Sequence, residues 1–134
     1  MTGQEPKLFA YLSYRDAPAG IGWLQALSFS TVTRQDGEGD RVIHAELRLG
    51  QVVVMVSSFD EDYDTPALYG RSVGYGLYIC TEDVEQLYEK ALASGGKSVL
   101  APESTEWGTR RARVLDPGGN EWSFGSYEPG HGWG

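Results

Sequence analysis

Hydrophobic and polar residues follow the same order twice along this chain. A strand-like run leads into a helix-like stretch that begins at an aspartate, and three further strand-like runs follow. In the first half these segments are residues 7–14, the helix from Asp16, and residues 29–34, 41–49 and 51–56. In the second half they are residues 74–80, the helix from Asp83, and residues 97–101, 109–115 and 120–127. A strand-helix-strand-strand-strand unit used twice predicts two sheets with a concavity between them, and therefore a pocket.

The helix that starts at Asp83 has the more regular pattern. Its apolar residues recur at spacings of three and four, at Val84, Leu87, Tyr88, Ala91 and Leu92. Asp83 is placed to cap this helix, and the Gly-Gly pair at residues 95–96 ends it. The helix that starts at Asp16 is less regular, because Gly20 and Gly22 lower its helical propensity.

Two neighbouring segments predict strands of different kinds. Residues 41–49 alternate, with mostly polar side chains, including His44 and Glu46, on one face and apolar side chains on the other. This pattern predicts a strand with one core face and one polar face. Residues 51–58 (QVVVMVSS) are apolar almost throughout, which predicts a strand covered on both sides.

Composition and charge narrow the possible functions. The chain has 134 residues, of which 40% are hydrophobic and 22% are charged, as expected of one soluble domain. Its formal net charge is −8 and its basic residues form no run, which argues against nucleic acid as a partner. This charge either favours a cationic or neutral small ligand or serves solubility alone. No apolar stretch is long enough to span a membrane, and the N-terminus lacks a secretory signal, so we expect a cytoplasmic protein without a membrane partner. The single cysteine, Cys80, fits a reducing compartment.

Three phrases of the sequence carry a family resemblance. They are YRDAPAGIGWLQALSF at residues 14–29, TEDVEQLYEKALASGG at 81–96 and WGTRRARVLDPGGNEWSFGSYEP at 107–129. Together they resemble the vicinal oxygen chelate superfamily, which includes glyoxalase, bleomycin-resistance and dioxygenase proteins. The resemblance covers residues 7–129. It implies an α+β fold in which two tandem βαβββ modules form a curved mixed sheet around a cleft.

This resemblance also suggests how the chain is divided. Residues 1–134 form a single domain, made of a first module, a connector, a second module and a tail, at residues 7–56, 57–73, 74–127 and 128–134. The long acidic connector is expected to form a mobile rim of the pocket. The Asp116-Pro-Gly-Gly-Asn120 segment predicts a tight turn between two strands, with a structural and not a catalytic role.

Enzymatic relatives, as the resemblance implies, hold a metal with His, Glu or Gln side chains on the opening and last strands of each module. The matching positions here are Phe9, Val54 beside Met55, Gly76 or Tyr75 after a one-residue slip, and Ser123. These side chains cannot hold a divalent ion. We therefore expect no metal, no cofactor, and no metal-dependent isomerase, dioxygenase or thiol-transferase activity.

Other candidate chemistry is sparse. His44 and Glu46 share one strand face two residues apart, so they form either an alternative metal or acid-base pair, or a polar ladder. Arg110, Arg111 and Arg113 alternate along a strand, in the pattern of a solvated face.

Aromatic residues are spread over both modules, several at positions that the resemblance places in the cleft. Such rings stack on planar ligands and attract cations, although for any single one core packing is the commoner role. The predicted ligand-binding residues are Phe9, Trp23, His44, Val54, Tyr75, Tyr78, Trp107, Trp122 and Ser123.

Functions of different classes follow from these observations. The first is a metal-free binding protein that sequesters a small aromatic or cationic compound or antibiotic, as bleomycin-resistance proteins do. The second is a lyase, isomerase or dioxygenase of the same superfamily that uses a displaced metal or acid-base residues alone. A ligand sensor or scaffold subunit is a third. The resemblance implies a homodimer, in which each cleft is formed by one chain or by modules exchanged between chains.

Overall fold

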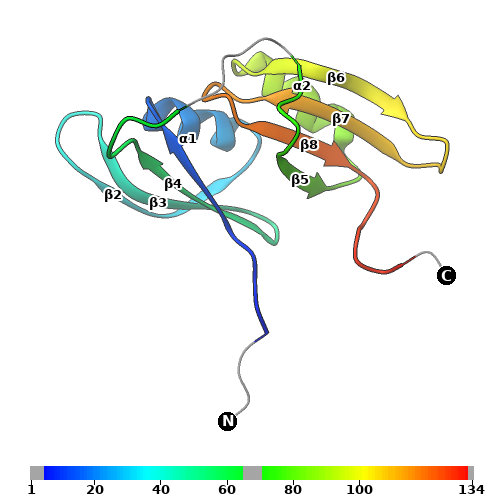
Figure 1. Cartoon of the computed structure of the whole chain (residues 1–134), viewed down its shortest axis with the longest axis horizontal. Helices are drawn as coiled ribbons and strands as arrows, with labels where there is room; N and C mark the ends of the chain where they lie inside the picture. Colours follow the sequence, from blue (N-terminus) through cyan, green and yellow to red (C-terminus); the bar gives the residue numbers. More distant parts are fainter. Residues whose placement is uncertain (1–4, 65–70, 133–134) are drawn as a thin grey trace.

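The computed structural model describes residues 5–64 and 71–132, and over these residues the chain forms ten elements (Figure 1). In the first module these are β1 (Ala10–Tyr14), α1 (Ala17–Ala26), β2 (Ser30–Asp36), β3 (Val42–Leu49) and β4 (Val52–Ser58). In the second they are β5 (Leu77–Cys80), α2 (Val84–Ala93), β6 (Lys97–Ser104), β7 (Arg110–Leu115) and β8 (Glu121–Gly125). The predicted repeat of a βαβββ unit and the α+β class are therefore confirmed.

Each module contributes one four-stranded mixed sheet. The strand orders are β1-β4-β3-β2 and β5-β8-β7-β6, so the two sheets have the same topology. In each sheet the first strand pairs in parallel with the last strand of the module, whereas the other pairs are antiparallel. The two sheets do not close into one barrel. The predicted connector and tail are described only in part, because residues 65–70 and 133–134 lie outside the described residues.

Several predicted boundaries shift for local reasons. The first strand begins at Ala10 and not at Lys7, because Leu8 is 97% exposed and the N-terminal segment leaves the domain without a pairing strand (Figure 1). β6 continues past its predicted end at Ala101, although Pro102 cannot donate a ladder hydrogen bond. The pairing with β7 absorbs this proline through a register shift between Leu100 and Glu103.

The two helices differ in how they begin. In α1 the predicted cap is confirmed, because Asp16 Oδ1 accepts a hydrogen bond from the Ala19 amide at 3.1 Å. In α2 the Asp83 side chain makes no capping bond, and the Asp83 amide donates instead to Thr81 Oγ1. The predicted end of α2 is confirmed at Gly95, whose φ of +107° is in the region that favours glycine.

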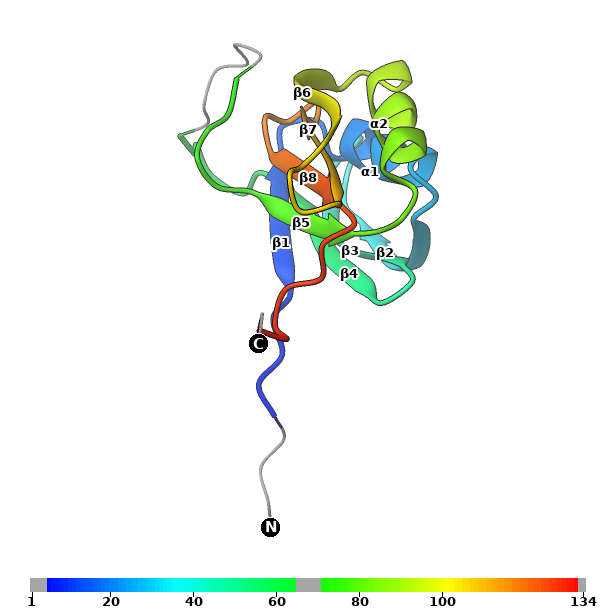
Figure 2. The same cartoon turned by 90° about the vertical axis from the view of Figure 1, so that its right-hand side faces the viewer.

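Both helices lie on the same side of the molecule, where they cover one face of each sheet (Figure 2). The core between them joins the two modules through aromatic side chains. The ring of Trp122 on β8 lies 5.7 Å from that of Trp23 on α1 and 6.1 Å from that of Phe29. Trp23 Nε1 also donates to the Ala91 carbonyl on α2 at 3.0 Å. The two modules therefore share a single hydrophobic core.

The predicted turn before β8 also ties the modules together. Asp116 is buried, and its Oδ2 accepts hydrogen bonds from the Tyr14 hydroxyl at 2.7 Å and from Trp122 Nε1 at 3.0 Å. Its Oδ1 accepts from the Gly118 amide at 2.9 Å, which shapes the turn. Burial and the neighbouring carboxylate raise the pKa of Tyr14 far above its ordinary value, so this phenol stays protonated. These contacts agree with a structural role for the turn.

The faces turned away from the helices are open. On β4, Val54 and Val56 are buried under the helix side, whereas Val53 and Met55 point to the other face and are only half-buried. The prediction that this strand is covered on both sides is therefore wrong for the single chain. The alternation predicted for β3 holds from His44 onward but reverses before it, where an irregularity in the pairing with β2 leaves Val42 buried and Ile43 exposed.

Candidate functional site

The open face of the second sheet carries a row of side chains from three adjacent strands. Ser123 on β8 lies directly opposite Arg113 on β7 and Tyr78 on β5. Directly opposed side chains on neighbouring strands lie about 5 Å apart at their Cβ atoms. This row forms one wall of a hollow of about 260 Å³. The hollow is lined by Ser72, Gly74, Tyr75, Gly76, Leu77, Tyr78, Arg113, Glu121 and Ser123.

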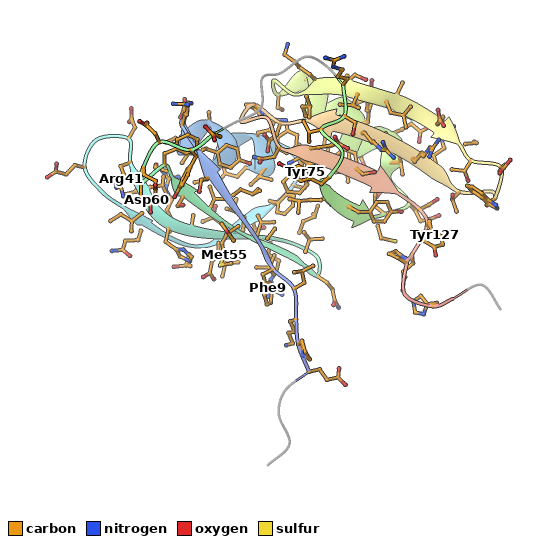
Figure 3. All side chains as sticks on the ribbon, viewed as in Figure 1. Phe9, Arg41, Met55, Asp60, Tyr75 and Tyr127 are labelled. Atoms are coloured by element: carbon orange, nitrogen blue, oxygen red, sulfur yellow. The ribbon has the colours of Figure 1, made fainter. Side chains whose placement is uncertain are left out.

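A second hollow, of about 310 Å³, continues from the first towards the first module. The two share Tyr75, Gly76, Leu77 and Glu121, and the second adds Phe9, Ala10, Tyr11, Leu12, Val73, Gly119 and Asn120. We call the two together the β1–β5 groove. Its β1 end is apolar and its β7 end is polar. Tyr75, which is labelled in Figure 3, belongs to both parts.

Glu121 holds the segment that leads into β5. Its side chain is buried, and Oε1 accepts hydrogen bonds from Ser72 Oγ at 2.9 Å and from the Val73 amide at 2.8 Å. Gly76 follows closely, and a Cβ at this position would lie 2.6 Å from the Glu121 carbonyl oxygen. Only glycine permits this close approach. The carboxylate and the glycine therefore fix the backbone on either side of Tyr75.

Tyr78 is oriented by the end of β8. Its hydroxyl donates to the Tyr127 carbonyl at 2.6 Å, and its ring covers Gly125, where any Cβ would overlap the phenol. Partial burial raises the pKa of Tyr78 above its ordinary value. The phenol is therefore a neutral, fixed wall of the groove, whose donor is already used.

Arg113 differs from the two other arginines of its strand. Arg110 Nε donates to Glu85 at 2.8 Å, and Arg111 Nη2 donates to Glu103 at the same distance. Arg113 is half-buried, and its side chain makes no hydrogen bond or ion pair within residues 5–64 and 71–132. The solvated face predicted for these arginines does not describe Arg113, which lines the groove.

Four of the nine predicted ligand-binding residues come together in the β1–β5 groove. They are Phe9, Tyr75, Tyr78 and Ser123. Trp23, Trp122 and Val54 lie in the core with at most 2% of their surface exposed, so a ligand cannot reach them in the single chain. His44 lies on the open face of the first sheet, and Trp107 is 79% exposed in the β6–β7 loop, outside the groove.

Arg113, Glu121 and Ser72 are groove residues that the sequence prediction missed. A signal for Arg113 exists in the turn, because a tight turn at residues 116–120 sets the hairpin register that places Arg113 opposite Ser123. No sequence signal pairs Glu121 with Ser72, since these residues are brought together only by the fold.

The residues at the family's metal positions do not fit a divalent ion. Phe9, Gly76 and Ser123 offer one hydroxyl between them, and on β4 the side chain that points to the open face is Met55. Among the described residues, no group of three or more His, Cys, Asp or Glu side chains lies close enough to bind a metal. The residues present therefore give no basis for a metal-dependent step.

Comparisons with known proteins agree with the fold described above. An uncharacterized protein of Mycobacterium bovis is 30% identical over 131 residues, which cover 90% of this chain and 83% of that protein. The structure of TioX from Micromonospora sp. ML1 matches with a TM-score of 0.68 at 24% identity, over 92% of this chain and 100% of TioX. A bleomycin-binding protein solved in complex with bleomycin matches with a TM-score of 0.62 at 20% identity, over 92% and 100% of the two chains.

Neither helix within the described part of the chain has the length and apolar content needed to cross a bilayer.

The family model of the Glyoxalase/Bleomycin resistance protein/Dioxygenase superfamily matches residues 10–124, which include every helix and nearly every strand residue described above. The chain therefore belongs to the Glyoxalase/Bleomycin resistance protein/Dioxygenase superfamily.

Proposed function

We propose that this protein binds a small planar organic molecule in the β1–β5 groove, without a metal. One observation carries the proposal: three aromatic residues predicted as ligand contacts, Phe9, Tyr75 and Tyr78, converge on one groove from segments of both modules. Aromatic side chains at a concave site provide stacking surfaces for planar ligands. Tyr75 is 77% exposed, so its ring is free to contact a ligand in either part of the groove.

The size of the groove limits the ligand. Each of its two parts is at or below the lower end of the roughly 300–1,000 Å³ typical of sites for drug-sized molecules. A molecule of one or two fused rings suits this space. Since a protein of the same fold is known in complex with bleomycin, sequestration of a harmful compound, such as an antibiotic, is the cellular role that we propose.

Local charge distinguishes between the two ligand types predicted from the sequence. The net charge of −8 favours a cation over the surface as a whole. Inside the groove, however, the Arg113 guanidinium has no carboxylate partner among the described residues, and it would repel a cation at the β7 end. We therefore favour an aromatic ligand over a cationic one.

The open faces support a homodimer. Val53 and Met55 on β4 are apolar yet have no helix over them, and Leu8 before the first strand is 97% exposed. Apolar surface of this kind marks protein interfaces. A second copy in the cytoplasm would cover it, and light scattering that shows only a monomer at high micromolar concentration would count against the dimer.

A matched pair of variants tests the binding proposal. Planar one- and two-ring compounds are screened by thermal shift, and affinities of the hits are measured by titration calorimetry. Tyr75→Ala should lower the affinity roughly tenfold, because it removes a stacking surface. Trp107→Ala is the control, since Trp107 is as exposed as Tyr75 but lies outside the groove. Equal losses in both variants, or a loss in Trp107→Ala alone, would move the site to the β6–β7 loop.

One contact favours the enzymatic alternative. His44 Nε2 lies 2.8 Å from Glu46 Oε2 on the open face of the first sheet, an arrangement in which a carboxylate orients an imidazole for acid-base work. This pair lies outside the β1–β5 groove. An enzyme that uses this pair would bind its substrate at the open face of the first sheet, so His44→Ala should abolish its turnover and leave binding in the groove unchanged.

A further inference from the structure

Arg113 is a positive charge placed in a hollow without a counterion from the described residues. It lies on the same strand face as Arg111, which is paired with Glu103, and close in sequence to Arg110, which is paired with Glu85. These neighbours show that carboxylates are available around this strand. Arg113 is instead opposite Ser123, whose hydroxyl also makes no hydrogen bond within residues 5–64 and 71–132.

The surroundings of Arg113 favour a bound anion over water as the partner of its guanidinium group. Partial burial weakens the hydration of a guanidinium and strengthens its attraction for an opposite charge. Its planar set of donors matches the two oxygens of a carboxylate, and the adjacent Ser123 hydroxyl is a further donor. Tyr78 cannot fill this role, because its hydroxyl already donates to Tyr127.

Glu121 places a carboxylate in the same hollow as the Arg113 guanidinium. Its carboxylate lines both parts of the groove and lies beyond salt-bridge distance of Arg113. A ligand anion is therefore attracted at the β7 end and repelled near Glu121. One cation with a carboxylate in the same groove favours a ligand with a single negative charge over one with several.

We propose that the groove selects planar organic acids, with the ligand carboxylate on Arg113 and Ser123 and the ring system against Tyr75. This inference rests on the proposed binding function and names its ligand class. It assigns to Arg113 the recognition of charge and to the aromatic residues the recognition of shape.

The test uses three probes that share one ring system and differ in charge. They are 2-naphthoate, the neutral 2-naphthamide and the cationic 2-naphthylmethylammonium, each titrated calorimetrically into the protein. A charge-assisted contact with Arg113 should make naphthoate bind about 10- to 100-fold more tightly than the amide. In Arg113→Gln this preference should disappear, whereas in the control Arg111→Gln, on the same strand face, it should persist.

The possible outcomes distinguish a failure of this inference from a failure of the proposed binding function. If the wild-type protein binds naphthoate and naphthamide equally, or if Arg113→Gln keeps the preference, the acid class is wrong while binding of planar molecules stands. If naphthylmethylammonium binds most tightly, the charge assignment is reversed. If none of the three probes binds at millimolar concentration, the proposed function fails together with the inference. Melting temperatures of both variants verify that the folded state is being compared.

Discussion

The two modules share one backbone plan but present different open faces. On the first sheet, His44 Nε2 and Glu46 Oε2 lie 2.8 Å apart, so both side chains have a partner within one strand. On the second sheet, Arg113 and Ser123 lie side by side in a hollow without partners among the described residues. The faces under the helices are apolar in both modules. The two modules thus share the fold, and the side chains of one open face distinguish the proposed ligand site from its counterpart in the other module.

The modules also differ in how tightly their first strands are held. Tyr14 at the end of β1 is inserted between Gly20 on α1 and Gly118 in the turn of the other module, and is bonded to Asp116. Cys80 at the end of β5 is exposed and has no such role. Tyr14 therefore links the first module to the second through its ring packing and its hydrogen bond. Loss of this hydrogen bond should be the single change that lowers the stability of the folded state most.

Asp116→Ala should have the largest effect on stability. It leaves the Tyr14 hydroxyl, Trp122 Nε1 and the turn amides without their acceptor in the core, at a cost of about 3–5 kcal/mol in the free energy of unfolding. Asp83→Ala is the matched control, since Asp83 begins a helix but makes no side-chain capping bond, and it should cost less than about 1 kcal/mol. Urea unfolding measures both. Similar costs for the two variants would show that Asp116 does not couple the modules.

Two glycines of α1 should respond to alanine in opposite directions. At Gly20 a Cβ would lie 2.8 Å from three atoms of the Tyr14 ring, and this ring is fixed by its hydrogen bond, so Gly20→Ala should cost about 1–3 kcal/mol through overpacking. At Gly22 a Cβ meets nothing within 4 Å, so Gly22→Ala should gain about 0.5–1 kcal/mol from helix propensity. Thermal and urea unfolding report both values. A stabilising Gly20→Ala would mean that Tyr14 is held loosely.

These examples show what the sequence predicted well and what it left open. The repeat and the turn at residues 116–120 led to the correct fold, because they depend on local patterns. The site depends on which face of a strand a residue occupies. Val54 is buried, whereas the next residue, Met55, lies on the open face. No local feature of the sequence indicates that Trp122 is buried whereas Tyr75 lies in the groove. The turn sets the register that places Arg113 opposite Ser123, but the lack of a partner for the Arg113 side chain among the described residues follows only from the tertiary fold.

Alkaline pH should weaken the link between the modules. Burial and the Asp116 carboxylate raise the pKa of Tyr14 in the folded protein, whereas in the unfolded chain it titrates near its ordinary value of about 10. The stabilisation that keeps Tyr14 protonated is thus complete below pH ~10 and is lost above it, by up to about 1.4 kcal/mol per pH unit. Tyr14→Phe should remove this part of the slope. Urea unfolding of both proteins between pH 9 and 11 measures the difference, and parallel curves would show that Tyr14 ionises freely in the folded state.

Metal removal should produce the smallest effect of all, because neither module supplies suitable ligands. The positions that match the family's ligands are Phe9 and Val54 in the first module, with Met55 beside Val54 on the open face, and Gly76 and Ser123 in the second. A metal present at 100 times its dissociation constant would stabilise the folded state by about 2.7 kcal/mol, so a chelator would lower the melting temperature by several degrees. We expect no such shift, and less than about one equivalent of Zn, Ni, Mn or Fe by elemental analysis. A stoichiometric metal that is lost in His44→Ala would instead show that the first sheet carries its own site, and would favour the enzymatic alternative over binding alone.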